Sequence, residues 1–197
     1  PTGVMLNRRD LESLLKILPA RTMLVLDEAY FEYARETEGY PDGIHYLKRH
    51  PNLVVLRTFS KIHGLASLRI GYAVAHPSII AELHKVRPPF NANSMAQSAA
   101  MAALSDRAHV ALCAERNAAE RARVQKEILA LGFPVYPSCA NFLLIGLRPR
   151  DPAGPEFFRA LARLGVIIRD LRPYGLLRHV RVTIGAREEN RRLISAM

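Results

Sequence analysis

The strongest constraint on the fold is a pair of short apolar runs, each followed at once by chemically active side chains. The runs lie at residues 23–26 and 52–57. Both have strand length and no polar alternation, which is typical of strands buried on both faces of a sheet. Helical periodicity at residues 8–19, 77–86 and 94–104 surrounds them. This alternation predicts an α/β fold with a mixed, mostly parallel sheet and flanking helices.

The pattern changes after residue 105. A polar–apolar segment from 106 to 131 predicts a long helix, which ends at Gly132, a natural C-terminal cap residue. Shorter elements follow: strands at 135–136, 141–145, 166–169 and 180–184, and helices at 155–164 and from 188 onward. We therefore expect two parts, an α/β part at residues 1–105 and a smaller α+β part, with its connecting helix, at residues 106–197.

Composition excludes some classes of protein and leaves others open. The net charge of +10 would suit a basic, non-catalytic nucleic-acid-binding module, but the Lys and Arg residues are dispersed and no zinc-finger or RNP-like motif occurs. No apolar run reaches the roughly 18 residues of a membrane helix. Cys113 and Cys139 are isolated, which predicts a reduced cytoplasmic protein with no disulfide framework and no metal site.

The side chains that follow the two apolar runs suit one cofactor, pyridoxal phosphate (PLP). Asp27 ends the first run, where ligands bind in open α/β sheets, and a buried carboxylate there could pair with a protonated ring nitrogen. Lys61 offers an amine that could form a Schiff base, and Arg69 offers a planar fork for a phosphate. Taken singly, each residue also fits a structural interpretation: a turn cap, a solvated lysine or a local ion pair. Tyr30 and Ser60 add a phenol and a hydroxyl to the set.

The order of these residues resembles a known family. The two segments read DEAYFEY at residues 27–33 and TFSKIHGLASLRIGY at residues 58–72. They resemble the fold type I PLP-dependent aminotransferases, and within them most closely the histidinol-phosphate aminotransferase group. Residues 87–93, 140–144 and 181–190 resemble the same group, so the resemblance spans the whole chain.

The resemblance implies a role for each matching residue. Lys61 would form the Schiff base and shuttle the proton, and Asp27 would pair with the ring nitrogen of the cofactor. Tyr30 would donate a hydrogen bond to the phenolic oxygen of the ring. Ser60 and Arg69 would bind the phosphate group of the cofactor.

The resemblance also implies the reaction. Arg181 would grip the anionic end of the substrate, and Arg169 matches a second substrate-side arginine; how they would divide a phosphate and a carboxylate stays open. The implied reaction converts histidinol phosphate and 2-oxoglutarate to imidazole-acetol phosphate and glutamate in a homodimer. A threonine-phosphate decarboxylase-like lyase and an aromatic amino-acid aminotransferase are the alternatives. Residues 1–105 would be the C-terminal half of the PLP-binding large domain, and residues 106–197 the connecting helix and small domain.

Two residues near these segments have no predicted part in the chemistry. His63 lies close to Lys61 but is not assigned a catalytic role, and Glu28 is interpreted as structural.

The chain starts at Pro1 with what resembles the tail of a family loop, and its last helix stops without a cap. We therefore expect a C-terminal portion of a longer protein, which alone would bind PLP poorly and transaminate negligibly.

Overall fold

The computed structural model describes all 197 residues, which divide into two compact units. The N-terminal unit comprises Leu6–Ala114, and the C-terminal unit comprises Pro1–Met5 together with Glu115–Met197. The long helix α5 (Arg107–Ala130) contributes residues to both. None of the helices combines the length and the apolar character that crossing a membrane requires.

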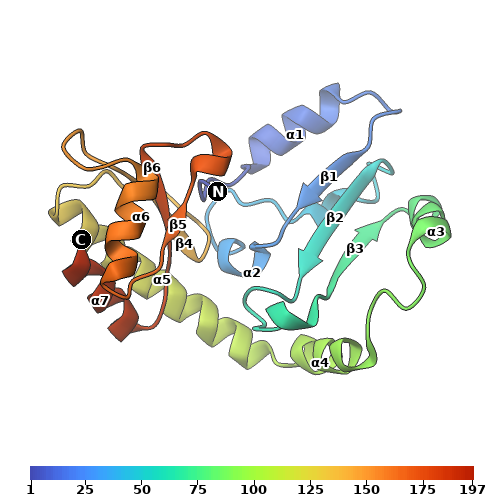
Figure 1. The fold of residues 1–197 in the computed structure, drawn as a ribbon. Helices are drawn as coiled ribbons and strands as arrows, with labels where there is room; N and C mark the ends of the chain where they lie inside the picture. Colours follow the sequence, from blue (N-terminus) through green and yellow to red (C-terminus); the bar gives the residue numbers. More distant parts are fainter. The chain divides into compact units, whose positions relative to one another are not determined.

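The N-terminal unit contains a three-stranded sheet in the order β1 (Leu24–Asp27), β2 (Leu53–Thr58) and β3 (Gly71–Ala75). β1 and β2 are parallel, with Asp27 opposite Leu56, whereas β3 runs antiparallel to β2. The arrowheads of β1 and β2 therefore point the same way in Figure 1. This places the residues that follow β1 and β2 at one edge of the sheet.

Short helices complete this unit. They are α1 (Arg8–Ile17), α2 (Phe31–Ala34), α3 (Pro77–Val86) and α4 (Ser94–Ser105), with 3-10 turns η1 (Gly43–Tyr46) and η2 (Ala66–Leu68). The polar residues and the Gly and Pro residues at 32–43 predict a loop, but α2 forms one helical turn at its start. A single turn is too short to show a period in the sequence.

The two apolar runs differ in burial. Leu53, Val54 and Val55 of β2 are buried, as predicted. In β1, however, burial alternates and Val25 is 51 % exposed, so the prediction of burial on both faces is wrong for this strand. β1 is an edge strand of the sheet, and one of its faces is not covered by any described element.

The C-terminal unit contains an antiparallel sheet in the order β4 (Phe142–Gly146), β6 (His179–Thr183) and β5 (Arg169–Asp170). The remaining elements are α6 (Gly154–Arg163), η3 (Arg172–Tyr174) and α7 (Arg187–Ala196). Two predicted strands are shorter in the structure than expected. Of the strand predicted at 166–169, only Arg169 is paired, in β5, and the strand predicted at 135–136 forms only a single bridge, from Val135 to Ile145. Short pairings of this kind depend on the partner strand rather than on the local sequence.

An apolar cluster forms the core of the C-terminal unit. β4 is buried along its whole length, and the rings of Phe133 and Phe157 pack edge to face with centroids 5.9 Å apart. The buried members come from helices, strands and the loops beside them: Val124, Ile128, Phe133, Leu143, Ile145, Leu147, Phe157, Leu161, Ile168, Val180, Val182 and Leu193. Burial of each large side chain contributes roughly 1.5–3 kcal/mol before entropy is considered.

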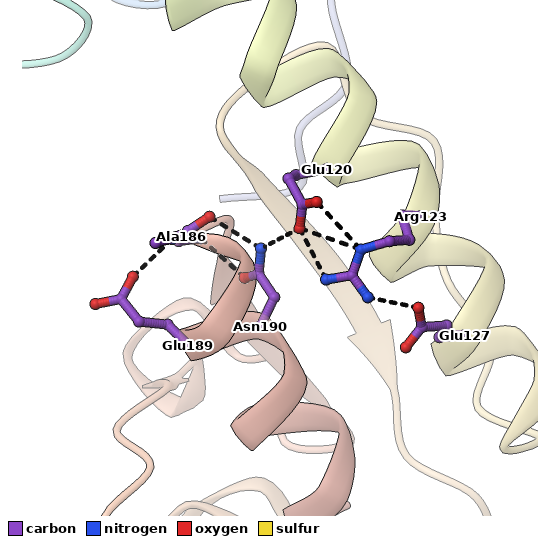
Figure 2. A network of polar contacts seen from close by, with 7 residues as sticks. Glu120, Arg123, Glu127, Ala186, Glu189 and Asn190 are labelled. Carbon is purple, nitrogen blue, oxygen red and sulfur yellow. Dashed lines mark hydrogen bonds and ion pairs between the residues drawn. The ribbon is translucent and has the colours of Figure 1, made fainter.

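One buried amide joins α7 to α5 beside this core (Figure 2). Asn190 is 2 % exposed, and its side chain donates to Glu120 at 2.9 Å and exchanges two hydrogen bonds with the backbone of Gly185. Glu120 also accepts from Arg123. These bonds satisfy the buried amide and fix the start of α7 against α5.

Candidate active site

Two segments that follow the parallel strands carry most of the predicted site residues. We call residues 27–33 the β1 segment and residues 59–64 the β2 segment. Lys61 is half-buried, and its Nζ lies 5.3 Å from the centroid of the Tyr30 ring. The structure thus brings the predicted amine and the predicted phenol together, one from each segment.

A tight turn presents Lys61. The backbone N–H of Gly64 donates to the carbonyl of Lys61 at 2.9 Å, and Gly64 has a φ of +71°, which favours glycine. The N–H of Ser60 donates to Oγ1 of Thr58 at 3.0 Å. The turn ends β2 and fixes the direction in which the lysine leaves the sheet.

Ser60 and Arg69 lie beside this turn. One guanidinium nitrogen of Arg69 donates to the carbonyl of Ala66 at 2.8 Å and lies 3.5 Å from Oγ of Ser60. Arg69 has a left-handed backbone with φ 55°, a conformation that costs a non-glycine residue about 1–2 kcal/mol. The sequence at residues 68–75 predicts a third strand, but the strand that forms there, β3, begins only at Gly71. Strain of this kind is common at ligand sites, and the exposed guanidinium of Arg69 and the half-buried hydroxyl of Ser60 could bind a phosphate.

Asp27 is the last residue of β1, and its side chain caps the turn that follows. Its Oδ1 accepts a hydrogen bond from the N–H of Ala29 at 3.0 Å. The prediction of a buried carboxylate is wrong for the described chain, because Asp27 is exposed at the uncovered edge strand. Its carboxylate is therefore accessible at the same edge of the sheet as the β2 segment.

A buried ion network lies next to Asp27. Glu28 is 3 % exposed and accepts hydrogen bonds from the N–H of Gly43 at 2.7 Å and from Nε of Arg57 at 2.9 Å. Arg57 also contacts Asp42 at 2.7 Å and stacks on Phe31, 3.5 Å from the ring centroid. Burial raises the pKa of Glu28, whereas the bonds from Gly43 and Arg57 act in the opposite direction.

Arg57 is a site residue for which the sequence motifs predict no role. The available signal was a charged side chain in an otherwise apolar strand, which requires a buried partner. Glu28 had been interpreted as structural, and it is that partner. The network ties the loop around η1 to the ends of β1 and β2.

The two predicted substrate-side arginines come together in the C-terminal unit. Arg169 and Arg181 are directly opposite each other in the antiparallel pair β5–β6. Directly opposed residues share a face of the sheet, and like charges there are destabilising. The guanidinium of Arg181 lies 4.8 Å over the ring of Phe142, and its buried Nε has no hydrogen-bond partner. An anion bound between the arginines would offset this repulsion and satisfy that nitrogen.

The fold and the two groups of side chains define a class of protein. An amine and a phenol lie at the edge of a parallel strand pair, with a phosphate-type clamp beside them, and an arginine pair lies in a separate α+β unit. No three His, Cys, Asp or Glu side chains gather to hold a metal ion. This combination fits an enzyme that binds a phosphorylated carbonyl compound and anionic substrates.

Comparison with known proteins identifies the family. The model of the family "Aminotransferase class I and II" matches residues 1–197, and the chain belongs to this family. It is 46 % identical over 197 residues to histidinol-phosphate aminotransferase 1 of Nitrosococcus oceani, covering 100 % of this chain and 52 % of that protein. The chain thus spans about half the length of the curated relatives it matches.

Solved structures give the same assignment. The histidinol-phosphate aminotransferase of Sinorhizobium meliloti in complex with pyridoxal-5'-phosphate matches with a TM-score of 0.85 and 31 % identity, covering 100 % of this chain and 53 % of that one. The L-threonine-O-3-phosphate decarboxylase of Porphyromonas gingivalis matches with a TM-score of 0.86 and 28 % identity, covering 100 % and 60 %. The predicted family and the predicted fold class, a partial PLP-dependent transferase fold, are confirmed.

Proposed function

We propose that this chain is part of a PLP-dependent aminotransferase that converts histidinol phosphate and 2-oxoglutarate to imidazole-acetol phosphate and glutamate. One observation carries the proposal: Nζ of Lys61 lies 5.3 Å from the Tyr30 ring, beside the Ser60–Arg69 pair, in a member of the aminotransferase family. The relatives named histidinol-phosphate aminotransferase, one of them with PLP bound, support the choice of substrate and cofactor.

The donor set fits the cofactor. Lys61 would hold its aldehyde, Asp27 its ring nitrogen and Tyr30 its phenolic oxygen, while Ser60 and Arg69 would hold its phosphate. When bound, PLP supplies an electron-poor ring that stabilises negative charge at the substrate carbon next to nitrogen. The carboxylate of Asp27 favours a protonated ring nitrogen and so maintains that property.

The protein's own side chains would then orient the substrate and move the proton. Nζ of Lys61 would take the proton from the substrate carbon and return it to the cofactor side, a transfer for which a positioned base contributes about 10²–10⁴-fold. The hydroxyl of Tyr30 would hold the cofactor ring in a fixed orientation relative to the amine of Lys61. Arg169 and Arg181 would bind the anionic groups of the substrates.

The arginine pair suits both proposed substrates. Histidinol phosphate carries a phosphate, and 2-oxoglutarate carries two carboxylates, so each offers an anion for the guanidinium forks. The proposal assigns residues 1–105 to the cofactor-binding domain and residues 106–197 to the connecting helix and small domain. It also assigns a cytoplasmic homodimer as the working form.

A labelling experiment tests the proposal. Borohydride reduction of the full-length protein, followed by digestion and mass spectrometry, should place a pyridoxyl label on the peptide that contains Lys61. Lys61→Ala should abolish the label and lower the rate of glutamate formation by at least about 10²-fold. Lys85→Ala is the matched control, because Lys85 is exposed and pairs only with nearby Glu82. A label on any other peptide, or none, would disprove the proposal.

The decarboxylase match supports a second candidate. A protein with this fold and arginine pair could bind threonine phosphate and release carbon dioxide, as the name of the Porphyromonas gingivalis relative indicates for that protein. Supplying histidinol phosphate and threonine phosphate in turn separates the two functions. Keto-acid product from the first identifies an aminotransferase, and carbon dioxide from the second identifies a decarboxylase.

A further inference from the structure

A buried histidine–glutamate pair connects the two segments that carry the candidate site. Nε2 of His63, in the β2 segment, lies 3.7 Å from Oε1 of Glu32, in the β1 segment. The two side chains are only 8 % and 11 % exposed. The pair is thus a polar link between the loop of Lys61 and the helical turn of Tyr30.

On one side, the link acts directly on the lysine turn. His63 lies between Lys61 and Gly64, inside the turn closed by the hydrogen bond from Gly64 to the Lys61 carbonyl. Its ring packs on Phe59, with centroids 5.1 Å apart, and Phe59 is itself buried at the end of β2. A displacement of the His63 ring would therefore shift the backbone from which Lys61 projects.

On the other side, the link acts on Tyr30. Glu32 lies in α2, whose single turn is closed by the N–H of Ala34 donating to the carbonyl of Tyr30 at 3.1 Å. A turn this short has few bonds of its own, so side-chain contacts must fix its orientation. Glu32 reaches from α2 to the β2 segment through its polar contact with His63.

Packing alone does not explain a histidine at this position. A phenylalanine could stack on Phe59 without burying polar nitrogen atoms. Nδ1 of His63 is buried and has no hydrogen-bond partner, which costs free energy that a packing residue would avoid. The other ring nitrogen, Nε2, faces the carboxylate of Glu32 at 3.7 Å, and attraction between polar groups is stronger in a site with little water.

We propose that His63 and Glu32 are positioning residues that set the approach of the Lys61 amine to Tyr30. Neither side chain touches the reacting atoms in this proposal; each acts through the residue whose turn it holds. The inference rests on the proposed function, because the distance between Lys61 and Tyr30 matters only if both act on one cofactor.

Three variants of the full-length, PLP-loaded protein test the inference. His63→Phe keeps the stacking on Phe59 and removes the link, and Glu32→Gln removes its charge. Both should lower kcat by about 10- to 100-fold with little change in KM, because misplacing a catalytic group by about 1 Å has such an effect. Both should also shift the absorbance band of the bound cofactor. His63→Gln, which can place a donor near the position of Nε2, should restore part of the lost rate.

Controls and a double variant complete the test. His84→Phe and Glu36→Gln change the same residue types at exposed positions and should leave kcat and the spectrum unchanged. The double variant, His63→Phe with Glu32→Gln, should be no slower than the worse single variant, because both changes remove one link. Losses that multiply, or single variants with normal kcat and spectrum, would overturn the inference.

The result also separates this inference from the proposed function. If borohydride labels Lys61 in the parent protein while His63→Phe keeps full activity, only the positioning role is wrong. If Lys61 is not labelled in the parent protein, the proposed function is wrong, and the positioning role is rejected with it.

Discussion

The two units of the chain are stabilised by different kinds of interior. The C-terminal unit encloses a continuous apolar cluster, and its strand β4 is buried throughout. In the N-terminal unit, the region around the candidate site instead buries charges, above all Glu28 and Arg57, while apolar Val25 stays exposed. The comparison indicates that the C-terminal unit gains its stability from a closed core. The site-bearing sheet depends more on a few polar contacts, which also set the geometry of the site.

The largest expected effect comes from breaking the buried ion pair. Arg57→Leu would leave the carboxylate of Glu28 buried without the guanidinium that donates two hydrogen bonds to its Oε2. Removing one member of such a pair costs about 3–5 kcal/mol of unfolding free energy. Urea unfolding followed by circular dichroism at pH 8 should show this loss, and hydrogen exchange should locate it in residues 24–58.

The matched control uses an exposed arginine in the same unit. Arg35 pairs with Glu36, and their side chains are 46 % and 82 % exposed. Arg35→Leu should change the unfolding free energy by less than about 1 kcal/mol, because exposed ion pairs contribute little. Equal losses for Arg35→Leu and Arg57→Leu would contradict the view that buried charges hold the site-bearing sheet together.

A second, smaller effect compares two valines. Val180, in β6, is fully buried, whereas Val25, in β1, is 51 % exposed. Val180→Ala removes two buried methyl groups and should cost about 2 kcal/mol, including the cavity. Val25→Ala should cost less than about 0.5 kcal/mol. The same unfolding measurement checks both, and a Val25 variant as damaging as the Val180 variant would show that the β1 face is covered in solution.

The elements that were predicted correctly are those whose ends or interior are marked by residues within the element itself or next to it. The helix expected at 77–86 is observed as Pro77–Val86, because Pro77 suits the first helical position and Pro88 prevents extension. β2 was predicted within one residue from its apolar run. The order of Asp27, Tyr30 and Lys61 along the chain was enough to propose one site, since strand ends gather at one edge of a sheet.

The features that the sequence did not predict depend on contacts between distant residues. The pairing of Arg169 with Arg181 requires the register of β5 on β6, which no local pattern specifies. The left-handed backbone of Arg69 arises at the end of η2, and this conformation is one that glycine adopts far more readily than arginine. The exposure of Val25 depends on whether another element covers that face of the sheet. The apolar run itself carries no signal for this, because its residues would be the same with or without such a cover.

The smallest expected effect is a difference in pH dependence between the two units. In the C-terminal unit, hydrogen bonds from Arg123 and Asn190 lower the pKa of Glu120 from 4.5 to about 2. In the N-terminal unit, burial raises the pKa of Glu28 above 4.5. Because the two shifts have opposite signs, the two carboxylates should contribute to stability in different pH ranges.

The sign follows from which state binds the proton more tightly. The stability that Glu120 contributes is present above pH 4.5 and is lost as the pH falls toward 2, because the unfolded chain protonates first. The contribution of Glu28 is present below pH 4.5 and is lost as the pH rises through its raised pKa, because the folded protein holds the proton longer. Each group can change the unfolding free energy by at most about 1.4 kcal/mol per pH unit, the effect of one proton.

Two charge-removing variants isolate these contributions. Glu120→Gln should flatten the stability profile between pH 4.5 and about 2, and Glu28→Gln should flatten it above pH 4.5. Unfolding free energies measured across this range for both variants and for the parent chain check the prediction. If both variants altered the profile in the same pH range and direction, the two carboxylates would occupy equivalent environments. The contrast between a closed apolar unit with solvated ion pairs and a site-bearing unit with buried charge would then be wrong.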